Sequence, residues 1–173
     1  MQKKFSYPLK IDELNQNEYK YVIVADKDEL ADITSILQVE DVKNLTADLC
    51  LKLNLREHIL KVWGTVTAQI ELKSVISLEN FIKPYSITFE KIYDTQANYE
   101  DLKEIDDDIY SEVPELIENG TIDLADIIIE QIAINLDDHP RAEGEVFDFS
   151  AYQTQEDTIV EENPFAILKQ LKK

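Results

Sequence analysis

The sequence predicts an α+β fold in which a curved antiparallel sheet or a partly closed β-barrel packs with two main helices. Residues 47–55 and 60–72 alternate apolar and polar side chains over long stretches, which is the period of half-buried strands. Residues 28–37 carry one apolar stripe at helical spacing, and residues 122–136 combine helical spacing with a high apolar density. An acidic loop and a short C-terminal helix complete the predicted architecture.

The two alternating stretches predict a hairpin at the centre of the sheet. On one face of this hairpin every residue except Gly64 is apolar, whereas Cys50 and Trp63 lie among polar residues on the other face. A glycine on the apolar face allows a bend or a close approach of another backbone. Strands of this length coil or curve, so the partly closed barrel stays an alternative to the open sheet. Shorter alternating stretches predict three further strands, over residues 5–11, 19–24 and 84–93.

Both predicted helices begin at an acidic capping residue. Asp26 precedes the helix over residues 28–37, with Glu29 at the third position of a capping box. Asp123 can cap the helix predicted within residues 122–136. Pro140 ends that segment, because the residue before a proline disfavours the helical region. So apolar a helix has to be covered on most sides. We expect it to cover the face of the sheet that carries Trp63, and we prefer this structural role for Trp63 to that of an interface anchor.

Charge is the outstanding feature of the composition. The chain has 36 acidic and 17 basic residues among 173, a net charge of −19. Such a surface repels bare nucleic acid and anionic membranes, and it suits either a basic partner or no specific target at all. Ten of the acids fall in residues 94–118, which are predicted to form the acidic loop. We expect one domain over residues 1–145, and an acidic tail over 146–173 that ends in the short helix.

The residue types needed for catalysis or metal binding are scarce. Cys50 is the only cysteine, and His58 and His139 are the only histidines, so neither a nucleophile–base pair nor a structural zinc site is indicated. We therefore expect no enzyme, no cofactor and no metal, with a hydrolase as a remote alternative. The chain lacks the apolar core of a signal peptide and any run of membrane-spanning length. These absences predict a cytoplasmic protein.

Three segments together resemble the YceD family, the large ribosomal RNA subunit accumulation proteins. The segments are GTVTAQIELKSVISLENF over residues 64–81, GTIDLADIIIEQIAINLDDHPRAEG over residues 120–144, and NPFAILKQL over residues 163–171. The motif residues at their centres are candidate partner-binding residues: Leu78, Glu79, Pro140, Arg141, Asn163, Pro164, Phe165 and Leu168.

The chain departs from the family pattern at three positions. Ser74 stands where many members carry a cysteine, Asn80 replaces the proline after Leu78-Glu79, and Asp138 stands where the first of two prolines often lies. These departures suggest a cysteine-poor branch, to which no metal-dependent behaviour is transferred.

The resemblance implies a role in the accumulation of large-subunit ribosomal RNA, without known catalysis. Because the net charge of −19 argues against direct binding of bare RNA, our hypothesis is a basic protein partner, such as a ribosomal protein or an assembly factor. The alternative is an acidic interaction module or nucleic-acid mimic unrelated to ribosomes. The sequence leaves the oligomeric state open.

Overall fold

A computed structural model describes residues 5–96 and 115–146 of the chain. Contacts between residues divide the chain into two units, Met1–Ala142 and Glu143–Lys173. Of the second unit the structure describes residues 143–146, which contain a turn at Gly144. The core of the predicted acidic loop, residues 97–114, and the predicted C-terminal helix lie outside the described residues. The fold below is that of the first unit.

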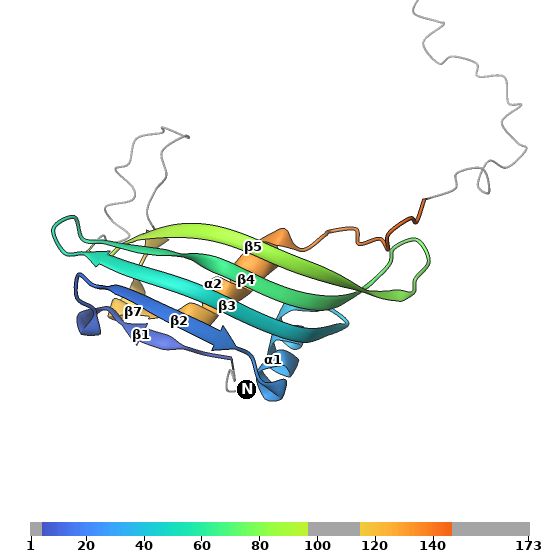
Figure 1. The fold of residues 1–173 in the computed structure, drawn as a ribbon, viewed down its shortest axis with the longest axis horizontal. Coiled ribbons are helices and arrows are strands. Elements are labelled where there is room, and N and C mark those ends of the chain that lie inside the picture. Colours follow the sequence, from blue (N-terminus) through green and yellow to red (C-terminus); the bar gives the residue numbers. More distant parts are fainter. Residues whose placement is uncertain (1–4, 97–114, 147–173) are drawn as a thin grey trace, which may run out of the picture. The chain divides into compact units, whose positions relative to one another are not determined.

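A five-stranded sheet forms the body of the first unit, in the order β2-β3-β4-β5-β6 (Figure 1). Its strands are β2 (Glu18–Val24), β3 (Asp41–Asn54), β4 (Ile59–Lys73), β5 (Asn80–Asp94) and β6 (Glu115–Leu116). All neighbours are antiparallel except β5 and β6. The sheet is curved but its edge strands β2 and β6 are not paired with each other. The open curved sheet is therefore the correct one of the two predicted forms, and the partly closed barrel is not formed.

A second, two-stranded sheet is made by β1 (Pro8–Lys10) and β7 (Thr121–Asp123). One-turn 3-10 helices follow β1 at Ile11–Glu13 and precede β7 at Glu118–Gly120. The predicted strand over residues 5–11 is correspondingly shorter in the structure. Its first apolar residue, Phe5, is instead fully buried in the core.

Two helices lie behind the large sheet, α1 (Lys27–Leu37) and α2 (Leu124–Asn135) (Figure 1). The predicted capping box of α1 is present, with the Asp26 side chain accepting from the Glu29 amide and the Glu29 side chain accepting from the Asp26 amide. At α2 the Asp123 carboxylate accepts from the Ala125 amide at 2.9 Å. Among the residues that the structure describes, no helix is long and apolar enough to span a membrane.

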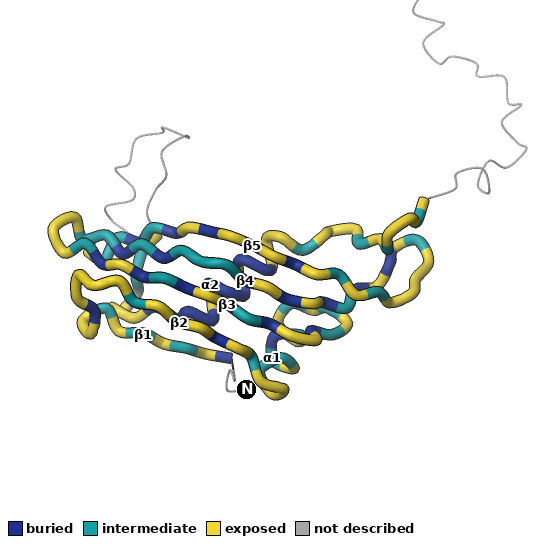
Figure 2. The backbone as a smooth tube through the Cα atoms, viewed as in Figure 1, coloured by how far each residue is buried: buried dark blue, intermediate teal, exposed yellow. Residues whose placement is uncertain are grey.

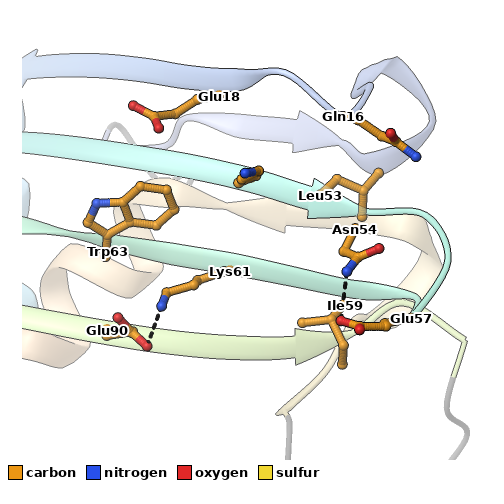
Figure 3. Close-up of a pocket in the computed structure, with 10 residues that line it drawn as sticks. Gln16, Glu18, Leu53, Asn54, Glu57, Ile59, Lys61, Trp63 and Glu90 are labelled. Carbon is orange, nitrogen blue, oxygen red and sulfur yellow. Dashed lines mark hydrogen bonds and ion pairs between the residues drawn. The ribbon is translucent and has the colours of Figure 1, made fainter.

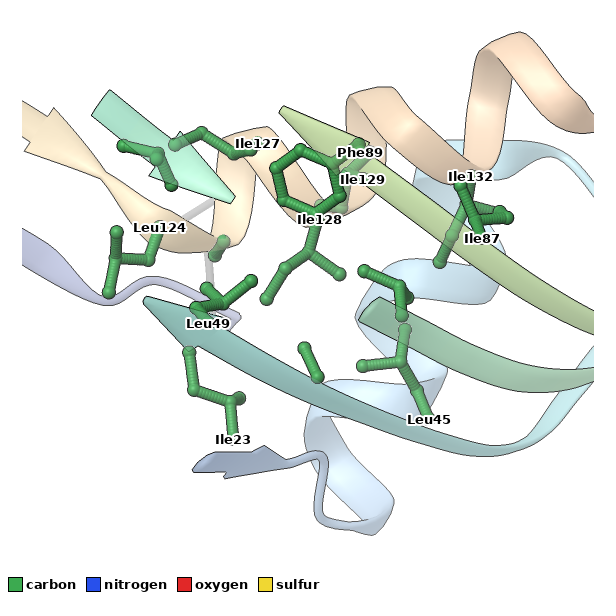
Figure 4. Packing of buried hydrophobic residues seen from close by; sticks show 14 of the residues in the cluster. Ile23, Leu45, Leu49, Ile87, Phe89, Leu124, Ile127, Ile128, Ile129 and Ile132 are labelled. Carbon is green, nitrogen blue, oxygen red and sulfur yellow. The ribbon is translucent and has the colours of Figure 1, made fainter. Parts of the chain in front are cut away.

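The core lies between the helices and one face of the sheet, here called the inner face. Buried and exposed residues alternate along β3, β4 and β5 (Figure 2), as the sequence predicts. In Figure 4 the side chains of α2 pack against Leu49 of β3 and against Ile87 and Phe89 of β5. Ile128 at the middle of α2 is completely buried.

The predicted position of α2 over Trp63 is wrong. Trp63 pairs with Cys50 and Glu90 in the sheet register, and these residues lie on the outer face, opposite to the core. The inner face is mostly apolar, with leucine, isoleucine and valine as its most frequent residues, so it offers the helix a larger apolar area than the polar residues around Trp63 do. An apolar helix takes the face that removes more apolar surface from water.

Gly64 occurs where β4 approaches β3 closely. A Cβ atom at Gly64 would lie 2.2 Å from the carbonyl oxygen of Asp48 and 3.0 Å from Cα of Leu49. Both contacts are to backbone atoms, which cannot rotate away. The predicted close approach at Gly64 is therefore correct, and it occurs near the middle of the curved hairpin.

Candidate functional site

The turn between β4 and β5 carries two of the predicted site residues and is organised by Ser74. The Ser74 hydroxyl accepts hydrogen bonds from the amides of Ile76, at 3.1 Å, and Ser77, at 3.3 Å. Its amide donates to the Glu79 carbonyl at 2.9 Å, and its carbonyl accepts from the Leu78 amide at 3.1 Å. Ser74 is almost completely buried. A short serine side chain thus satisfies the backbone of this turn.

Leu78 combines an unusual backbone conformation with an unusual exposure. Its φ angle is 61°, in the left-handed region that costs a residue with a Cβ atom roughly 1–2 kcal/mol. Its side chain is nevertheless 66% exposed, and the neighbouring Val75 is 46% exposed. The strained conformation therefore holds an apolar side chain in solvent instead of burying it. Strain retained at an exposed position is a reason to suspect a binding role.

The chain segment after α2 meets this turn. The amide of Val75 donates a hydrogen bond to the Pro140 carbonyl at 2.9 Å, which brings together two of the family-like segments from distant parts of the sequence. Arg141 follows and is exposed. We call Val75, Leu78, Glu79, Pro140 and Arg141 the turn surface. Four of its five residues are among the eight that the sequence predicts as partner-binding.

An ion pair fixes the end of α2 next to the turn surface. Lys83 on the inner face of β5 donates to the Asp137 carboxylate, and this bond raises the pKa of Lys83. Burial, followed by the charge of Asp137, raises the pKa of the neighbouring Tyr85. The Asp137 carboxylate therefore pairs with Lys83 and not with Arg141. No acid in the described part of the chain forms an ion pair with Arg141.

A shallow hollow of about 260 Å³ adjoins Pro140. It lies between the end of α1, the end of β4 and the exit from α2. Its apolar lining comes from Leu37, Val39, Leu72, Leu136 and Pro140, and its polar lining from Gln38, Glu40, Lys73 and Asp137. A hollow of this size and lining suits one aliphatic side chain of a bound protein.

A larger hollow of about 710 Å³ lies on the outer face around Trp63 (Figure 3). Lys61 forms an ion pair with Glu90 at 2.7 Å, and its ammonium lies 5.9 Å from the centre of the Trp63 ring. Trp63 is half-buried by these polar neighbours and not by a helix. The interface interpretation of Trp63, the less favoured one from sequence, therefore stays open.

Lys91 is a buried, charged residue that is absent from the predicted site. Its side chain is 8% exposed on the inner face of β5, and Nζ lies 2.6 Å from a carboxylate oxygen of both Glu115 and Glu130. Burial lowers the pKa of Lys91, but the hydrogen bonds to the two carboxylates outweigh it, so the pKa is raised. The signal was available, because Lys91 has the same parity as the apolar Phe89 and Tyr93. A lysine buried on an apolar face indicates nearby carboxylate partners.

The remaining predicted site residues, Asn163, Pro164, Phe165 and Leu168, lie outside the described residues. Within residues 5–96 and 115–146, no three histidine, cysteine or acidic side chains are grouped so that they could hold a metal ion. Cys50 is half-buried on the outer face, opposite Trp63.

A comparison with protein-family models gives one match, to the model described as "Large ribosomal RNA subunit accumulation protein YceD", over residues 62–172. Neither the curated proteins nor the solved structures contain a match to this chain. The matched region begins within β4 and includes every residue of the turn surface.

Proposed function

The chain belongs to the YceD family of large ribosomal RNA subunit accumulation proteins, and on this premise we propose that it is a non-catalytic factor that binds a basic protein partner. The family name links the chain to the accumulation of large-subunit ribosomal RNA. The partner in our proposal is a ribosomal protein or an assembly factor, and the action on RNA is indirect. The contact is made by the turn surface.

The observation that carries the proposal is the hydrogen bond between Val75 and Pro140. It joins two motif-bearing segments into one surface, on which Leu78 is held exposed at a conformational cost. Burial of the Leu78 side chain within the domain does not offset that cost, because the side chain is mostly in solvent. A partner that buries Leu78 would account for it.

The charge of the chain supports a basic partner. A net charge of −19 repels the phosphates of bare RNA, whose binding depends on lysine and arginine contacts. The same charge accelerates the encounter with a basic protein, and this attraction weakens as salt screens it. Ribosomal and assembly proteins that bind RNA phosphates do so through lysine and arginine, so their charge is opposite to that of this chain.

The carboxylates of the described residues support a non-catalytic role. A general acid at neutral pH needs a carboxyl group whose pKa is raised. Here the pKa values of Asp41 and Glu71 are lowered, mainly by hydrogen bonds from Lys43. These carboxylates are tuned to stay charged, which suits ion pairing and not proton transfer.

The alternative of an acidic nucleic-acid mimic receives less support. A mimic needs an ordered row of carboxylates with phosphate-like spacing. On the outer face of the described sheet, acids are paired with lysines, as in Glu18 with Lys20 and Glu90 with Lys61. These pairs neutralise the face on which such a row would have room to form.

The test uses the full chain as bait and proteins extracted from purified large ribosomal subunits as the probe. We expect a small set of basic proteins to be retained at low salt and, in part, at moderate salt. Leu78→Ser should reduce retention by about tenfold, the effect of losing one interface anchor. Leu55→Ser is the matched control, because Leu55 is also an exposed leucine, 49% accessible, in the turn between β3 and β4.

Retention of no ribosomal protein by the wild-type chain would overturn the proposal. Equal loss with Leu55→Ser and Leu78→Ser would remove the turn surface from it. In cells that lack the protein, large-subunit RNA should fall, and the Leu78→Ser chain should restore it less than the Leu55→Ser chain.

A further inference from the structure

The edge strand β2 has an open hydrogen-bonding side, and we propose that it accepts an extended segment of the basic partner as an additional strand. This inference rests on the proposed function, because it specifies how the same partner is held. It concerns a different surface from the turn surface. The sheet order places β2 at the end of the sheet, next to β3 alone.

The ladder between β2 and β3 fixes which backbone groups face outward. The amide of Ala25 donates to the Leu45 carbonyl at 3.1 Å, in continuation of the register that pairs Val24 with Thr46. Antiparallel pairs alternate between hydrogen-bonded and non-hydrogen-bonded. Ile23 and Tyr21 therefore bond to β3, whereas the N–H and C=O groups of the residues between them face away from the sheet.

β2 has four outward-facing residues, Glu18, Lys20, Val22 and Val24, and the last three flank Tyr21 and Ile23. Within the described part of the chain, no group forms a hydrogen bond with their outward N–H and C=O groups. β1 pairs with β7 instead of with this edge. Three alternate positions of an added strand thus find unused donors and acceptors at the correct spacing.

The side chains at this edge also lack the usual protection. Native edge strands are blunted by charges, prolines or bulges, because an unpaired edge is a template for another strand. Lys20 provides such a charge at one end, but Val22 is 70% exposed and Val24 is 65% exposed on the outer face. The second half of β2 therefore presents apolar, β-branched side chains beside open backbone groups, the combination that strand addition uses.

Charge selects the occupant. At one end of the edge Glu18 already forms an ion pair with Lys20. At the other end Asp26 and Asp28 flank Lys27 at the start of α1, so the excess acidic charge lies at the α1 end. A second copy of the chain is disfavoured by the same residues. The antiparallel register that pairs the last three outward residues of two copies sets Glu18 of each opposite Asp26 of the other, and like charges directly opposite are destabilising.

A basic extended segment meets these conditions. It needs about five residues to span positions 20–24. Apolar or β-branched side chains should lie beside Val22 and Val24, and a lysine or arginine at the end next to α1 should reach Asp26. Basic proteins with extended arms of this pattern are the chemical class that we assign to this edge.

Amide hydrogen exchange tests the inference on the full chain, with the protein retained most strongly from the large-subunit extract as the probe. The amides of Lys20, Val22 and Val24 should exchange quickly in the free chain and at least about tenfold more slowly in the complex. The amides of Tyr21 and Ile23, already bonded to β3, serve as internal references and should change little. Binding without protection of the three outward amides would overturn the inference and leave the proposed function standing.

Two variants of one residue provide the second arm. Val22→Pro removes an outward N–H without removing a bond to β3, and it should weaken binding about tenfold. Val22→Thr keeps the N–H and the β-branch and should bind within about twofold of wild type. Equal affinity of the two variants would contradict strand addition. If the three outward amides become protected in the chain alone as its concentration rises, the edge binds a second copy and the inference is overturned. If the wild-type chain retains no extracted protein, both the inference and the proposed function are overturned.

Discussion

Replacing Leu78 by glycine distinguishes a contribution of Leu78 to the stability of the domain from a contribution to partner binding. Leu78 has a φ of 61° and is 66% exposed. If the residue serves the fold, its loss should destabilise the domain. If it serves a partner, the glycine variant should fold at least as well and bind less.

The magnitude follows from three opposing contributions. Removing the left-handed strain stabilises the domain by roughly 1–2 kcal/mol. The greater freedom of glycine in the unfolded chain costs about 0.4–1 kcal/mol. Loss of the buried third of the side chain costs about 0.5–1 kcal/mol, a third of the value for full burial. The free energy of unfolding of Leu78→Gly should therefore lie within about 1 kcal/mol of wild type.

Leu78→Ala is the matched comparison, because alanine loses the same contacts and keeps the strained backbone. It should be less stable than Leu78→Gly by roughly 1 kcal/mol. Urea unfolding followed by the fluorescence of Trp63, the single tryptophan, measures both variants. Both should retain about tenfold less of the extracted large-subunit proteins than wild type does. A loss of stability above about 2 kcal/mol in Leu78→Gly, or unchanged retention, would refute the assignment of Leu78 to binding.

Three further predictions concern the fold. Gly64→Ala should lower the free energy of unfolding by about 1–3 kcal/mol, because its Cβ would meet the Asp48 carbonyl oxygen at 2.2 Å; an unchanged urea midpoint would show that β3 and β4 separate easily. Ile128→Asp should prevent folding, since it places a charge in a fully buried site at a cost above about 4 kcal/mol; a cooperative transition in the variant would contradict this. The free energy of unfolding should fall as pH rises from 10 to 12. Burial and the hydrogen bond to Glu29 raise the pKa of Tyr7 from 10.0 to about 12, so in this range the folded state holds a proton that the unfolded state releases. A Tyr7→Phe chain with the same alkaline slope would exclude Tyr7 as its cause.

Local patterns in the sequence predicted most elements of the fold. Alternation identified β3, β4 and β5 and assigned their inner faces, because each strand is buried on one side only. The structure extends the strands beyond the prediction, β3 as far as Asp41 and β5 as far as Asn80. Capping residues located both helix starts, since Asp26 and Asp123 satisfy helix-terminal amides whatever the tertiary context.

Features that depend on contacts between distant residues were not predictable in this way. The single sequence does not state which face of the sheet a helix covers, so α2 was expected over Trp63 and packs on the opposite face. The partners of Lys91 come from α2 and β6, which lie far from it in sequence. The left-handed conformation of Leu78 has no local signal, because leucine is a poor residue for it.

The part of the candidate site that could be predicted is the set of motif residues in each segment. Leu78, Glu79, Pro140 and Arg141 were identified from sequence. Their proximity was not, because it depends on the hydrogen bond from Val75 to Pro140 and on the ion pair that fixes Asp137. Val75 carries no motif and was missed for that reason.

The parallel pairing of β6 with β5 has a consequence for protein engineering. Tyr93 pairs with Glu115 and Asp94 with Leu116, so the described residues that flank positions 97–114 lie on neighbouring strands of the sheet. Another sequence can therefore be inserted between these two strands, because doubling the length of a closed loop raises the free energy of loop closure by only about 0.6 kcal/mol. A neutral glycine–serine segment of equal length, grafted between Gln96 and Glu115, would change the charge of the chain while preserving the ammonium–carboxylate clamp at Lys91.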